Sequence, residues 1–471
     1  MRPRMGMGIF VLAGVAVVTI VTWVITPTVT AAGTSRQIAQ LFAALALAGF
    51  AAGFAISTRN RLVDRLFNGL DKAYVVHKVL AICSVALVIL HVMMVGEGHE
   101  GRGPGGGEHH APLAGLGGPS LFLFIVIVVL ALFAKKLKYE NWRLIHKVMI
   151  VPYVIGVAHY YGSSTYGALQ PSAFSIWLTI ANVIGLTSAV YSIFLAGRLG
   201  FRHKYVVTAT RLVADKMMEI TATTTGRPVK SRPGQFAFVV LNDKEFTPHP
   251  FTISGTPGPN TIQFTIKNLG DHTARLVDTV APGDEIAISN AHGTFDYTRG
   301  TQQQIWIAGG IGITPFRAFY SAGVADNHEV DFFYAYHGEP EAAYLDELES
   351  LRADNLRVHL IDDTQVGFLN WDMIKARLAD NWDGSSPRTN GTVPVRGHQG
   401  QTQRGGTTIS EAPWNGGRGP FREGVLAFHQ ARPIDIYFCG PKPMREALRK
   451  SLPGSGIPVV GFHYEEFGFG R

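Results

Sequence analysis

Four histidines in two apolar stretches are the first candidates for chemistry in this chain. His77 and His91 are 14 residues apart, and His146 and His159 are 13 apart. Ionisable side chains inside apolar segments are costly to bury and usually serve a function. Imidazoles on two facing helices can bind a haem iron from opposite sides. The pattern therefore predicts two haem sites about 20 Å apart along the helices, one held by His77 and His146, the other by His91 and His159.

The helical phase of the two spacings differs. Fourteen residues return to within about 40° of the same helix face, whereas thirteen miss it by about 140°. Pro152 lies between His146 and His159, and a proline removes a backbone hydrogen bond and distorts a helix. The second spacing therefore requires a distorted helix. Two alternatives are four unrelated packing histidines and a zinc or copper site, which would need more ligands at one depth.

Long stretches without charged residues predict that these histidines lie in a membrane. Charged residues make up only 16% of the 471 residues, whereas 46% are hydrophobic. A helix needs about 20 apolar residues to cross a bilayer. The sequence predicts six transmembrane spans, at residues 8–26, 37–56, 73–95, 119–134, 142–161 and 173–196. A cleaved signal peptide is the alternative for the first span, but its apolar stretch is long for one.

The positive charges indicate the orientation in the membrane. Lys and Arg gather before the first span, in alternate loops and after the sixth span, whereas the opposite loops hold only Arg36 and Arg102. Because cytoplasmic loops carry the basic excess, both termini are predicted in the cytoplasm of a plasma-membrane protein. The net charge of +7 therefore reflects topology and does not indicate nucleic-acid binding. Two cysteines, Cys83 and Cys439, exclude a disulfide scaffold and a four-cysteine zinc site.

Residues 203–300 alternate short β-like runs with Gly/Pro turns, which is typical of a small barrel. Two segments in this region can hold a flavin, which needs a ring partner, hydroxyl donors, and cations or amides for its pyrophosphate. Phe251 and Thr252 can supply the first two, and Lys267 with the turn Gly270–Thr273 the last. An edge strand and a charged turn would look similar, so each segment alone is a weak signal.

Residues 303–445 alternate strand and helix patterns, which predicts an α/β domain. An apolar strand leads into the glycine-rich turn Gly309–Thr314, where glycines allow close approach of a phosphate. Thr314 is the expected N-cap and Pro315 the expected first residue of the next helix. A later strand ends in Cys439-Gly440-Pro441. Because ligands of such sheets bind beyond the carboxyl ends of the strands, both segments are predicted to face one nucleotide; Cys439 also has a plain alternative as a small buried residue.

Taken together, these motifs resemble the NADPH oxidase and ferric reductase superfamily in its short bacterial form, over nearly the whole chain. The histidine spacings match that family. His-Pro-Phe-Thr-Ile-Ser from His249 is similar to its flavin motif. Gly-Gly-Ile-Gly-Ile-Thr-Pro-Phe from Gly309 and Phe-Cys-Gly-Pro from Phe438 are similar to its nicotinamide-nucleotide motifs, and the ending around Phe467 is similar to its aromatic tail.

The resemblance implies FAD, two haem b groups, and NADPH or NADH as the electron donor. It implies that Cys439 lies near the nicotinamide and that Phe467 covers the flavin until the nicotinamide displaces it. The FAD residues that it implies are His249, Pro250, Phe251, Thr252, Ile266, Lys267, Gly270 and Thr273. The nucleotide residues that it implies are Gly309, Gly310, Gly312, Thr314, Pro315 and Gly440. The segment Tyr336–Glu339 lacks an Arg for a 2′-phosphate, so NADPH and NADH both stay open.

The predicted architecture has three domains. A six-helix transmembrane haem-binding bundle covers residues 1–200, an antiparallel β-barrel FAD domain covers 201–300, and a ferredoxin reductase-like α/β nucleotide-binding domain covers 301–471. Residues 384–425 are rich in Gly, Thr, Ser and Arg, which predicts an exposed, disordered insertion in the last domain.

Electron counting predicts the order of transfer. Nicotinamide gives two electrons as a hydride and each haem iron takes one, so a flavin, which accepts a pair and releases single electrons, belongs between them. The predicted path runs from cytoplasmic NAD(P)H through FAD, the inner haem and the outer haem to an external acceptor. With two imidazoles on each iron, the haems pass electrons rather than bind oxygen.

The external acceptor is predicted to be oxygen, which gives superoxide, with a ferric chelate as the alternative. The outer loop at residues 96–119 carries five residues that can gather metal ions, unless it is simply a flexible glycine-rich loop; they are His99, Glu100, Glu108, His109 and His110. No required protein partner is evident. A non-enzymatic haem-binding membrane anchor or sensor is the remaining alternative.

Overall fold

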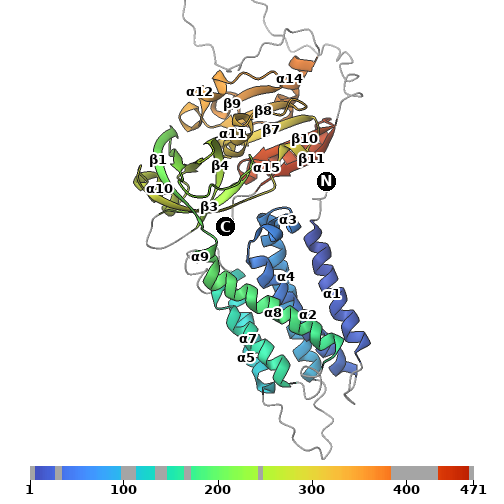
Figure 1. Ribbon diagram of the computed structural model, residues 1–471. Coiled ribbons are helices and arrows are strands. Elements are labelled where there is room, and N and C mark those ends of the chain that lie inside the picture. The colour runs from blue at the N-terminus through green and yellow to red at the C-terminus, as the bar shows by residue number, and fades with distance from the viewer. Residues whose placement is uncertain are drawn as a thin grey trace, which may run out of the picture. The chain divides into compact units, whose positions relative to one another are not determined.

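The computed structural model describes residues 6–26, 34–96, 113–132, 146–163, 171–241, 248–382 and 433–465. The chain divides into two compact units (Figure 1). The first, the helical unit, comprises chiefly residues 2–203. The second, the reductase unit, comprises chiefly residues 204–465.

The described part of the helical unit consists mainly of apolar helices. Its elements are α1 (Met7–Ile25), α2 (Thr34–Ser57), α3 (Arg61–Phe67), α4 (Leu70–Gly96), the 3₁₀ turn η2 (Ala114–Leu116), α5 (Gly117–Leu132), α7 (Ile150–Ser163), α8 (Ala173–Val190), the π-helical turn η4 (Tyr191–Leu195) and α9 (Ala196–Leu199). Among the described residues, α1, α2, α4 and α8 with its extension are long and apolar enough to cross a membrane. Within the described residues, α5 and α7 overlap the predicted fourth and fifth spans and have 16 and 14 residues, so helix length there supports four of the six predicted spans.

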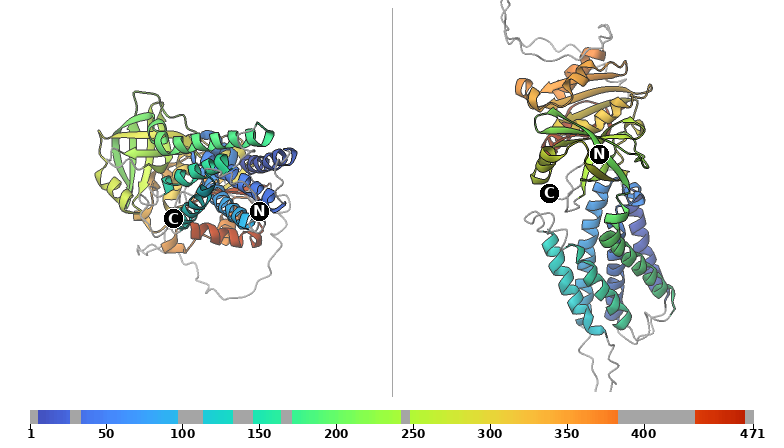
Figure 2. Two further views of the ribbon diagram at one scale, coloured as in Figure 1. Left: turned by 90° about the horizontal axis from the view of Figure 1, so that it is seen from below. Right: turned by 60° about the vertical axis from the view of Figure 1, so that its left-hand side comes forward.

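Small residues let α2 pack closely against its neighbours α4 and α8 (Figure 2). Gly49 of α2 faces Ser84 of α4, and a Cβ added at Gly49 would collide with the Ser84 hydroxyl. Such small residues are the usual contact points of helices in membranes, because no hydrophobic force acts between helices in lipid. Larger side chains fill the rest of the core: the rings of Phe50 and Phe124 stack 4.1 Å apart, and the Tyr153 hydroxyl donates to Asn182 over 3.1 Å.

One helix of this unit, α3, lies where the sequence predicted a loop. Asn60 caps its start by accepting a hydrogen bond from the Val63 amide over 2.9 Å. Asn68 ends it in the left-handed region at φ 55°, which Asn adopts more readily than most residues. Asn60 and Asn68-Gly69 are therefore sequence signals for the two ends of a helix. The helix has only seven residues, which is too short for a hydrophobic periodicity to indicate it.

The reductase unit begins with a closed barrel in the order β1-β2-β5-β4-β3-β6. The strands are β1 (His203–Ala214), β2 (Met217–Thr223), β3 (Phe236–Leu241), β4 (His249–Gly258), β5 (Thr261–Lys267) and β6 (Glu285–His292), with helix α10 (Asp271–Thr279) between the last two. The pairings β1–β2, β2–β5, β3–β4 and β4–β5 are antiparallel, which confirms the predicted antiparallel barrel.

A five-stranded parallel sheet follows, in the order β11-β10-β7-β8-β9. Its elements are β7 (Gln303–Gly309), η6 (Gly310–Ile313), α11 (Thr314–Ser321), β8 (Glu329–Tyr336), α12 (Leu345–Ser350), β9 (Leu356–Asp362), α13 (Asp363–Val366), α14 (Trp371–Trp382), β10 (Ile434–Cys439), α15 (Lys442–Ser451) and β11 (Val459–Tyr464). This order is that of a doubly wound nucleotide-binding fold, which confirms the predicted α/β domain.

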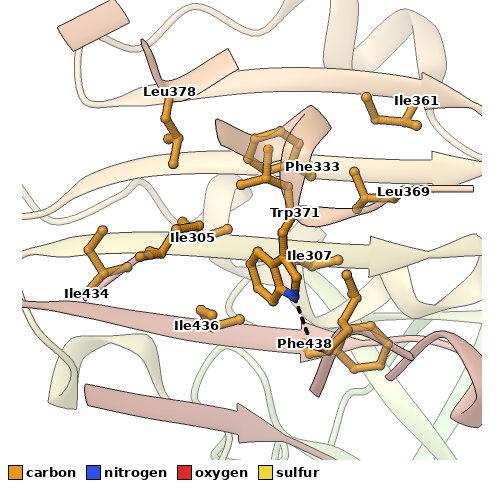
Figure 3. Close-up of a cluster of buried hydrophobic side chains, with 13 residues drawn as sticks. Ile305, Ile307, Phe333, Ile361, Leu369, Trp371, Leu378, Ile434, Ile436 and Phe438 are labelled. Carbon is orange, nitrogen blue, oxygen red and sulfur yellow. Dashed lines mark hydrogen bonds between the residues drawn. The ribbon is translucent and has the colours of Figure 1, made fainter. Parts of the chain in front are cut away.

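The core of this sheet is apolar because strands covered on both faces need continuous hydrophobic runs. Ile305, Ile307 and Phe438 belong to the buried cluster between the sheet and Trp371 of α14 (Figure 3). The Trp371 indole Nε1 donates to the Leu448 carbonyl over 2.8 Å, so α14 and α15 are tied together on the same side of the sheet. The sheet is therefore a rigid support for the turns at the carboxyl ends of its strands.

Candidate haem and nucleotide sites

The helical unit brings two of the four predicted ligands into a ring pair. His77 in α4 and His146, which precedes α7, have ring centroids 6.0 Å apart and ring planes at 67°. A metal lies about 2.0 Å from an imidazole nitrogen, so two rings on opposite sides of one iron have centroids on the order of 6 Å apart. The separation of His77 and His146 therefore fits one iron between them.

Backbone carbonyls of α2 orient both histidines of α4. His77 Nδ1 lies 3.0 Å from the Gly53 carbonyl, and His91 Nδ1 lies 2.8 Å from the Ala39 carbonyl. A carbonyl oxygen can only accept, so Nδ1 carries the proton and Nε2 keeps its lone pair. Metal-binding histidines usually have their second nitrogen held in this way. The two acceptors are 14 residues apart, like the two histidines, so α2 repeats the spacing of α4.

His159 in α7 has the same arrangement with a different partner. Its Nδ1 lies 3.3 Å from the Leu113 carbonyl. A Cβ built on Gly117 would lie 3.0 Å from the His159 ring carbon Cε1 and 3.1 Å from Nε2. Glycine at the start of α5 therefore leaves room beside the nitrogen that would bind iron.

The helix between His146 and His159 is distorted, as the phase of the spacing requires. Residues 148 and 149 form a turn rather than a helix, and the Met149 and Val151 amides donate to carbonyls three residues earlier. Such bonds wind the chain by about 120° per residue instead of about 100°. The tighter winding reduces the 140° shortfall expected for thirteen residues of a straight helix, and it lies next to Pro152.

The first candidate flavin segment is the amino-terminal half of β4. His249 and Phe251 are half-buried on one face of the strand, with ring centroids 6.5 Å apart and ring planes at 23°. Pro250 and Thr252 alternate with them, and the Thr252 side chain is buried. β4 therefore presents two roughly parallel rings on one face, which suits contact with a planar ligand.

The second candidate flavin segment runs from the end of β5 into α10. Ile266 is buried, and the Thr273 hydroxyl accepts hydrogen bonds from the Leu269 and Gly270 amides over 2.9 and 3.2 Å. This network forms the start of a nine-residue helix, where backbone dipoles favour an anion. Lys267 Nζ, predicted to meet the pyrophosphate, lies 3.0 Å from the Glu341 carboxylate, a partner that the sequence did not indicate.

The two predicted nucleotide segments meet through their backbones. Cys439 pairs with Ala308 in the parallel ladder, so β7 and β10 end at the same level. A Cβ on Gly312 would collide with the Cys439 carbonyl, and one on Gly440 would lie 3.0 Å from the Gly309 amide. Gly310 has φ 53°, a conformation that glycine adopts without strain. Glycine is therefore required wherever the turn after β7 touches the turn after β10.

The predicted helix start after this turn was wrong by one residue. Residues Gly310–Ile313 form a 3₁₀ turn, and α11 begins at Thr314 with Ile313 in the cap position. The Thr314 hydroxyl donates to the Ile311 carbonyl over 3.2 Å instead of capping the helix, and Pro315 follows in the first turn. The cap motif in the sequence did not show that a 3₁₀ turn precedes the helix and moves its start by one residue.

Cys439 lies buried at the end of β10 with 2% of its surface exposed. Burial first, and the charge of Glu465 second, raise the pKa of its thiol well above the ordinary value. The side chain is therefore a neutral thiol and not a nucleophile.

Phe467, the insertion at residues 384–425, and the metal-gathering residues of the outer loop lie outside the described residues. Among the residues that the structure does describe, no cluster of three or more His, Cys, Asp or Glu side chains forms a metal site.

A buried charged network in the reductase unit was missed from the sequence. Arg317 of α11 lies 2.9 Å from Glu219 of β2 and 3.2 Å from Glu347 of α12. The Tyr344 ring lies under its guanidinium at 4.3 Å, and the Tyr344 hydroxyl donates to Glu219 over 3.0 Å. Its only sequence signal is one arginine in an apolar helix, because the partners lie far away along the chain. The network fixes α11, which follows the glycine turn, against the barrel.

Three family models match consecutive parts of the chain. A ferric reductase like transmembrane component matches residues 42–157, an FAD-binding domain matches 202–303, and an oxidoreductase NAD-binding domain matches 306–390. This order is the architecture of the NADPH oxidase and ferric reductase superfamily, so the resemblance is confirmed. The chain therefore combines a region similar to a ferric reductase like transmembrane component with an FAD-binding domain and an NAD-binding domain. The first match includes His77, His91 and His146 and ends two residues before His159.

Curated relatives are similar to the reductase half. A glycine betaine monooxygenase reductase subunit of Chromohalobacter salexigens is 23% identical over 252 residues, which are 50% of this chain and 56% of the relative. A flavohemoprotein of Pseudomonas putida is 24% identical over 249 residues, which are 52% of this chain and 53% of the relative. The chain thus spans little more than half the length of these relatives. Among solved structures, a flavohemoglobin from Malassezia yamatoensis aligns over 93% of this chain and 100% of its own, with 14% identity and a TM-score of 0.43.

Proposed function

We propose that this oxidoreductase moves electrons from cytoplasmic NAD(P)H through FAD and two bis-histidine haems to an acceptor on the other side of the membrane. Oxygen, reduced to superoxide, is the acceptor that we propose first. The observation that carries the proposal is the orientation of the histidines: a ring separation of 6.0 Å for His77 and His146, and Nδ1 atoms held by backbone carbonyls.

The spacing along α4 supports two haems at different depths. The helix is continuous from Leu70 to Gly96, so His77 and His91 lie about 21 Å apart at 1.5 Å per residue. Both point toward α2, since carbonyls of that helix hold both rings. One helix therefore presents a ligand near each membrane surface, which suits transfer across the bilayer better than a single buried haem does.

The reductase unit supports the donor side. When bound, FAD accepts two electrons from the nicotinamide and the haems carry single electrons onward. The protein's own contribution is to hold these groups. His249 to Thr252 would bind the flavin ring, Lys267 and the amides at the start of α10 its pyrophosphate, and Gly309 to Ile313 the nucleotide phosphates. Cys439 as a neutral thiol would pack against the nicotinamide, and Phe467 would cover the flavin in its absence.

A ferric chelate is the second candidate acceptor. The match of residues 42–157 to a ferric reductase like transmembrane component favours it, and superoxide formation uses the same electron path. Only the reaction of the reduced protein with each acceptor can therefore distinguish oxygen from a ferric chelate, because both share the donor side.

Anaerobic reduction of the purified, FAD-supplemented protein in detergent tests the proposal. We expect NADH or NADPH to reduce first the flavin and then the haem, and a subsequent addition of oxygen to reoxidise the haem with formation of superoxide. Reoxidation by a ferric chelate but not by oxygen would establish the second candidate. Haem that stays oxidised under excess nucleotide and FAD would contradict the proposal and favour a non-enzymatic haem protein.

A further inference from the structure

The strand order sets where the two ends of a dinucleotide lie. β10 flanks β7 on one side, and β8 followed by β9 flanks it on the other. A dinucleotide lies across the carboxyl ends of such strands. With the nicotinamide at Cys439, which rests on the proposed function, the adenosine ribose reaches the ends of β8 and β9. In this fold a carboxylate there binds the 2′-hydroxyl of NADH, whereas an arginine accommodates the 2′-phosphate of NADPH.

Two turns at the ends of β8 and β9 form one continuous edge. Tyr336 at the end of β8 pairs with Asp362 at the end of β9. The Asp362 carboxylate accepts from the Gly338 amide over 3.0 Å and from the Thr364 hydroxyl over 2.6 Å. Asp362 therefore ties the two turns together. Both turns lie inside the region that matches the NAD-binding domain, residues 306–390.

Four carboxylates gather at this edge, and three of them are engaged. Asp362 holds the turns, Asp363 lies 2.7 Å from His337 Nδ1, and Glu341 lies 3.0 Å from Lys267 Nζ. Glu339 is exposed, and within the described part of the chain its carboxylate makes no hydrogen bond or ion pair. Glu339 comes three residues after β8, so it is the carboxylate that remains for a ligand.

Lysine and arginine side chains that could hold a phosphate are missing from both turns. The sequence has no Lys or Arg from Tyr336 to Leu351 or from Asp362 to Ile374. His337 already faces Asp363, whose hydrogen bond raises the pKa of the imidazole. Burial, and after it the charges of Asp362 and Glu339, raise the pKa of the Tyr336 phenol to about 12. The edge is therefore negative, and a 2′-phosphate would bring about 1.5 to 2 further negative charges.

We infer that this chain uses NADH in preference to NADPH, with Glu339 accepting a hydrogen bond from the 2′-hydroxyl of the adenosine ribose. Asp362 and Asp363 repel a 2′-phosphate at the same position. Like charges brought together at an interface are strongly unfavourable, and a site built for a hydroxyl rejects analogues by large factors.

The rate of flavin reduction in the full-length holoprotein, measured anaerobically by stopped flow with NADH and with NADPH, tests this inference. We expect kcat/KM to be on the order of 100-fold higher for NADH. In Glu339→Arg, kcat/KM should fall for NADH and rise about tenfold or more for NADPH, because the 2′-phosphate then meets a cation. Asp346→Arg is the matched control, since Asp346 is equally exposed but lies in α12; it should leave the ratio of the two rates unchanged.

Several results would overturn the inference. Equal or faster reduction by NADPH in the unaltered protein would do so while leaving the proposed function intact. An equal shift of the ratio in Glu339→Arg and Asp346→Arg would show a general charge effect instead of a ribose contact. Loss of NADPH activity in His337→Gln would make that histidine a ligand of the 2′-phosphate. If neither nucleotide reduces the flavin, the proposed function itself fails, and the preference fails with it.

Discussion

The helical unit and the reductase unit position their functional groups in opposite ways. In the helical unit the proposed functional groups are side chains, the histidines, and backbone carbonyls such as those of Gly53 and Ala39 orient them. In the turn Gly309–Ile313 after β7, the nucleotide turn, the proposed functional groups are backbone amides, and the absence of side chains at Gly309 and Gly312 lets this turn approach the turn after β10. The helical site is therefore sensitive to the loss of atoms, and the nucleotide turn to the gain of them.

The largest effect is expected from removing one imidazole from the helical unit. In His77→Ala the inner haem should be lost, because a single remaining ring does not replace two axial ligands, and acceptor reduction should fall by more than about 100-fold. Anaerobic flavin reduction should continue, since the reductase unit is unchanged. Haem content and the two rates measure this.

Cys83→Ala is the matched control on the same helix. Because Cys83 is exposed on α4, this variant should keep both haems. A His77→Ala protein with two haems per chain would contradict the ligand assignment. Loss of flavin reduction together with haem would mean that His77→Ala also impairs the reductase unit, so the two units would not respond independently.

The second largest effect is expected from adding one methyl group to the nucleotide turn. In Gly312→Ala the new Cβ would collide with the Cys439 carbonyl, which must separate the ends of β7 and β10. A displacement of about 1 Å at a binding turn can reduce a rate by about 100-fold. We expect kcat/KM for flavin reduction by the nucleotide to fall to that extent while haem content stays normal. Gly454→Ala, where no atom lies within 4 Å of the added Cβ, should match the unaltered protein.

The buried charge network predicts a third effect, on stability rather than on rate. Arg317→Met leaves Glu219 buried without its cation, and Glu219 is only 5% exposed. Removing one partner of a buried ion pair costs about 3–5 kcal/mol of unfolding free energy. Thermal unfolding of the reductase unit should show it, and adding Glu219→Gln should recover part of the loss. Equal stability of Arg317→Met and the unaltered protein would mean that the network does not fix α11.

A smaller effect is expected where the helical unit has a glycine of the same kind. In Gly117→Ala the new methyl group would lie 3.0 Å from the His159 ring and crowd the side that would face iron. Changes beside a metal ligand weaken metal binding by about tenfold or more, so the outer haem should be lost preferentially during purification. Gly115→Ala, with no neighbour within 4 Å, should retain it. If the Gly117→Ala protein keeps its outer haem, only the nucleotide turn is sensitive to an added methyl group.

The smallest effect is an acid limit on the stability of the parallel sheet. Burial would raise the pKa of Asp331, but hydrogen bonds from Arg357 and His359 outweigh it and hold the pKa below the ordinary value of 3.8. A carboxyl with a lowered folded-state pKa contributes stability that is present above the unfolded pKa and is lost as the pH falls through the folded value. Unfolding followed by circular dichroism should show this loss below about pH 3.8. An Asp331→Asn variant with the same pH profile would refute this source.

The difference between the units also explains what the sequence could predict. Spans such as 73–95 agreed with α4 to within three residues, because a bilayer imposes a length that shows up as missing charge. The prediction that His77 and His91 lie on nearly the same face of one helix needed only the repeat of 3.6 residues per turn. The glycine turn was recognisable because few residues other than glycine permit such close approach of backbones.

The partners that lie far apart in the chain could not be predicted in this way. Lys267 is predicted to face a pyrophosphate, and the carboxylate that accepts a hydrogen bond from its Nζ comes 74 residues later, from Glu341. Arg317 meets Glu219 and Glu347 only after the barrel and the sheet have packed together. Local patterns specify which element forms, whereas ion pairs of this kind depend on how the elements meet.

The buried thiol at the end of β10 has a consequence for chemical durability. Oxidants such as peroxides attack thiolates far faster than thiols, and the raised pKa of Cys439 leaves almost no thiolate at neutral pH. A cysteine can therefore stay beside the nucleotide turn of an oxidoreductase without becoming its point of inactivation. Cys83 is exposed in the middle of α4, a helix long and apolar enough to cross a membrane, so there lipid rather than packed protein would keep water-soluble oxidants away from the thiol.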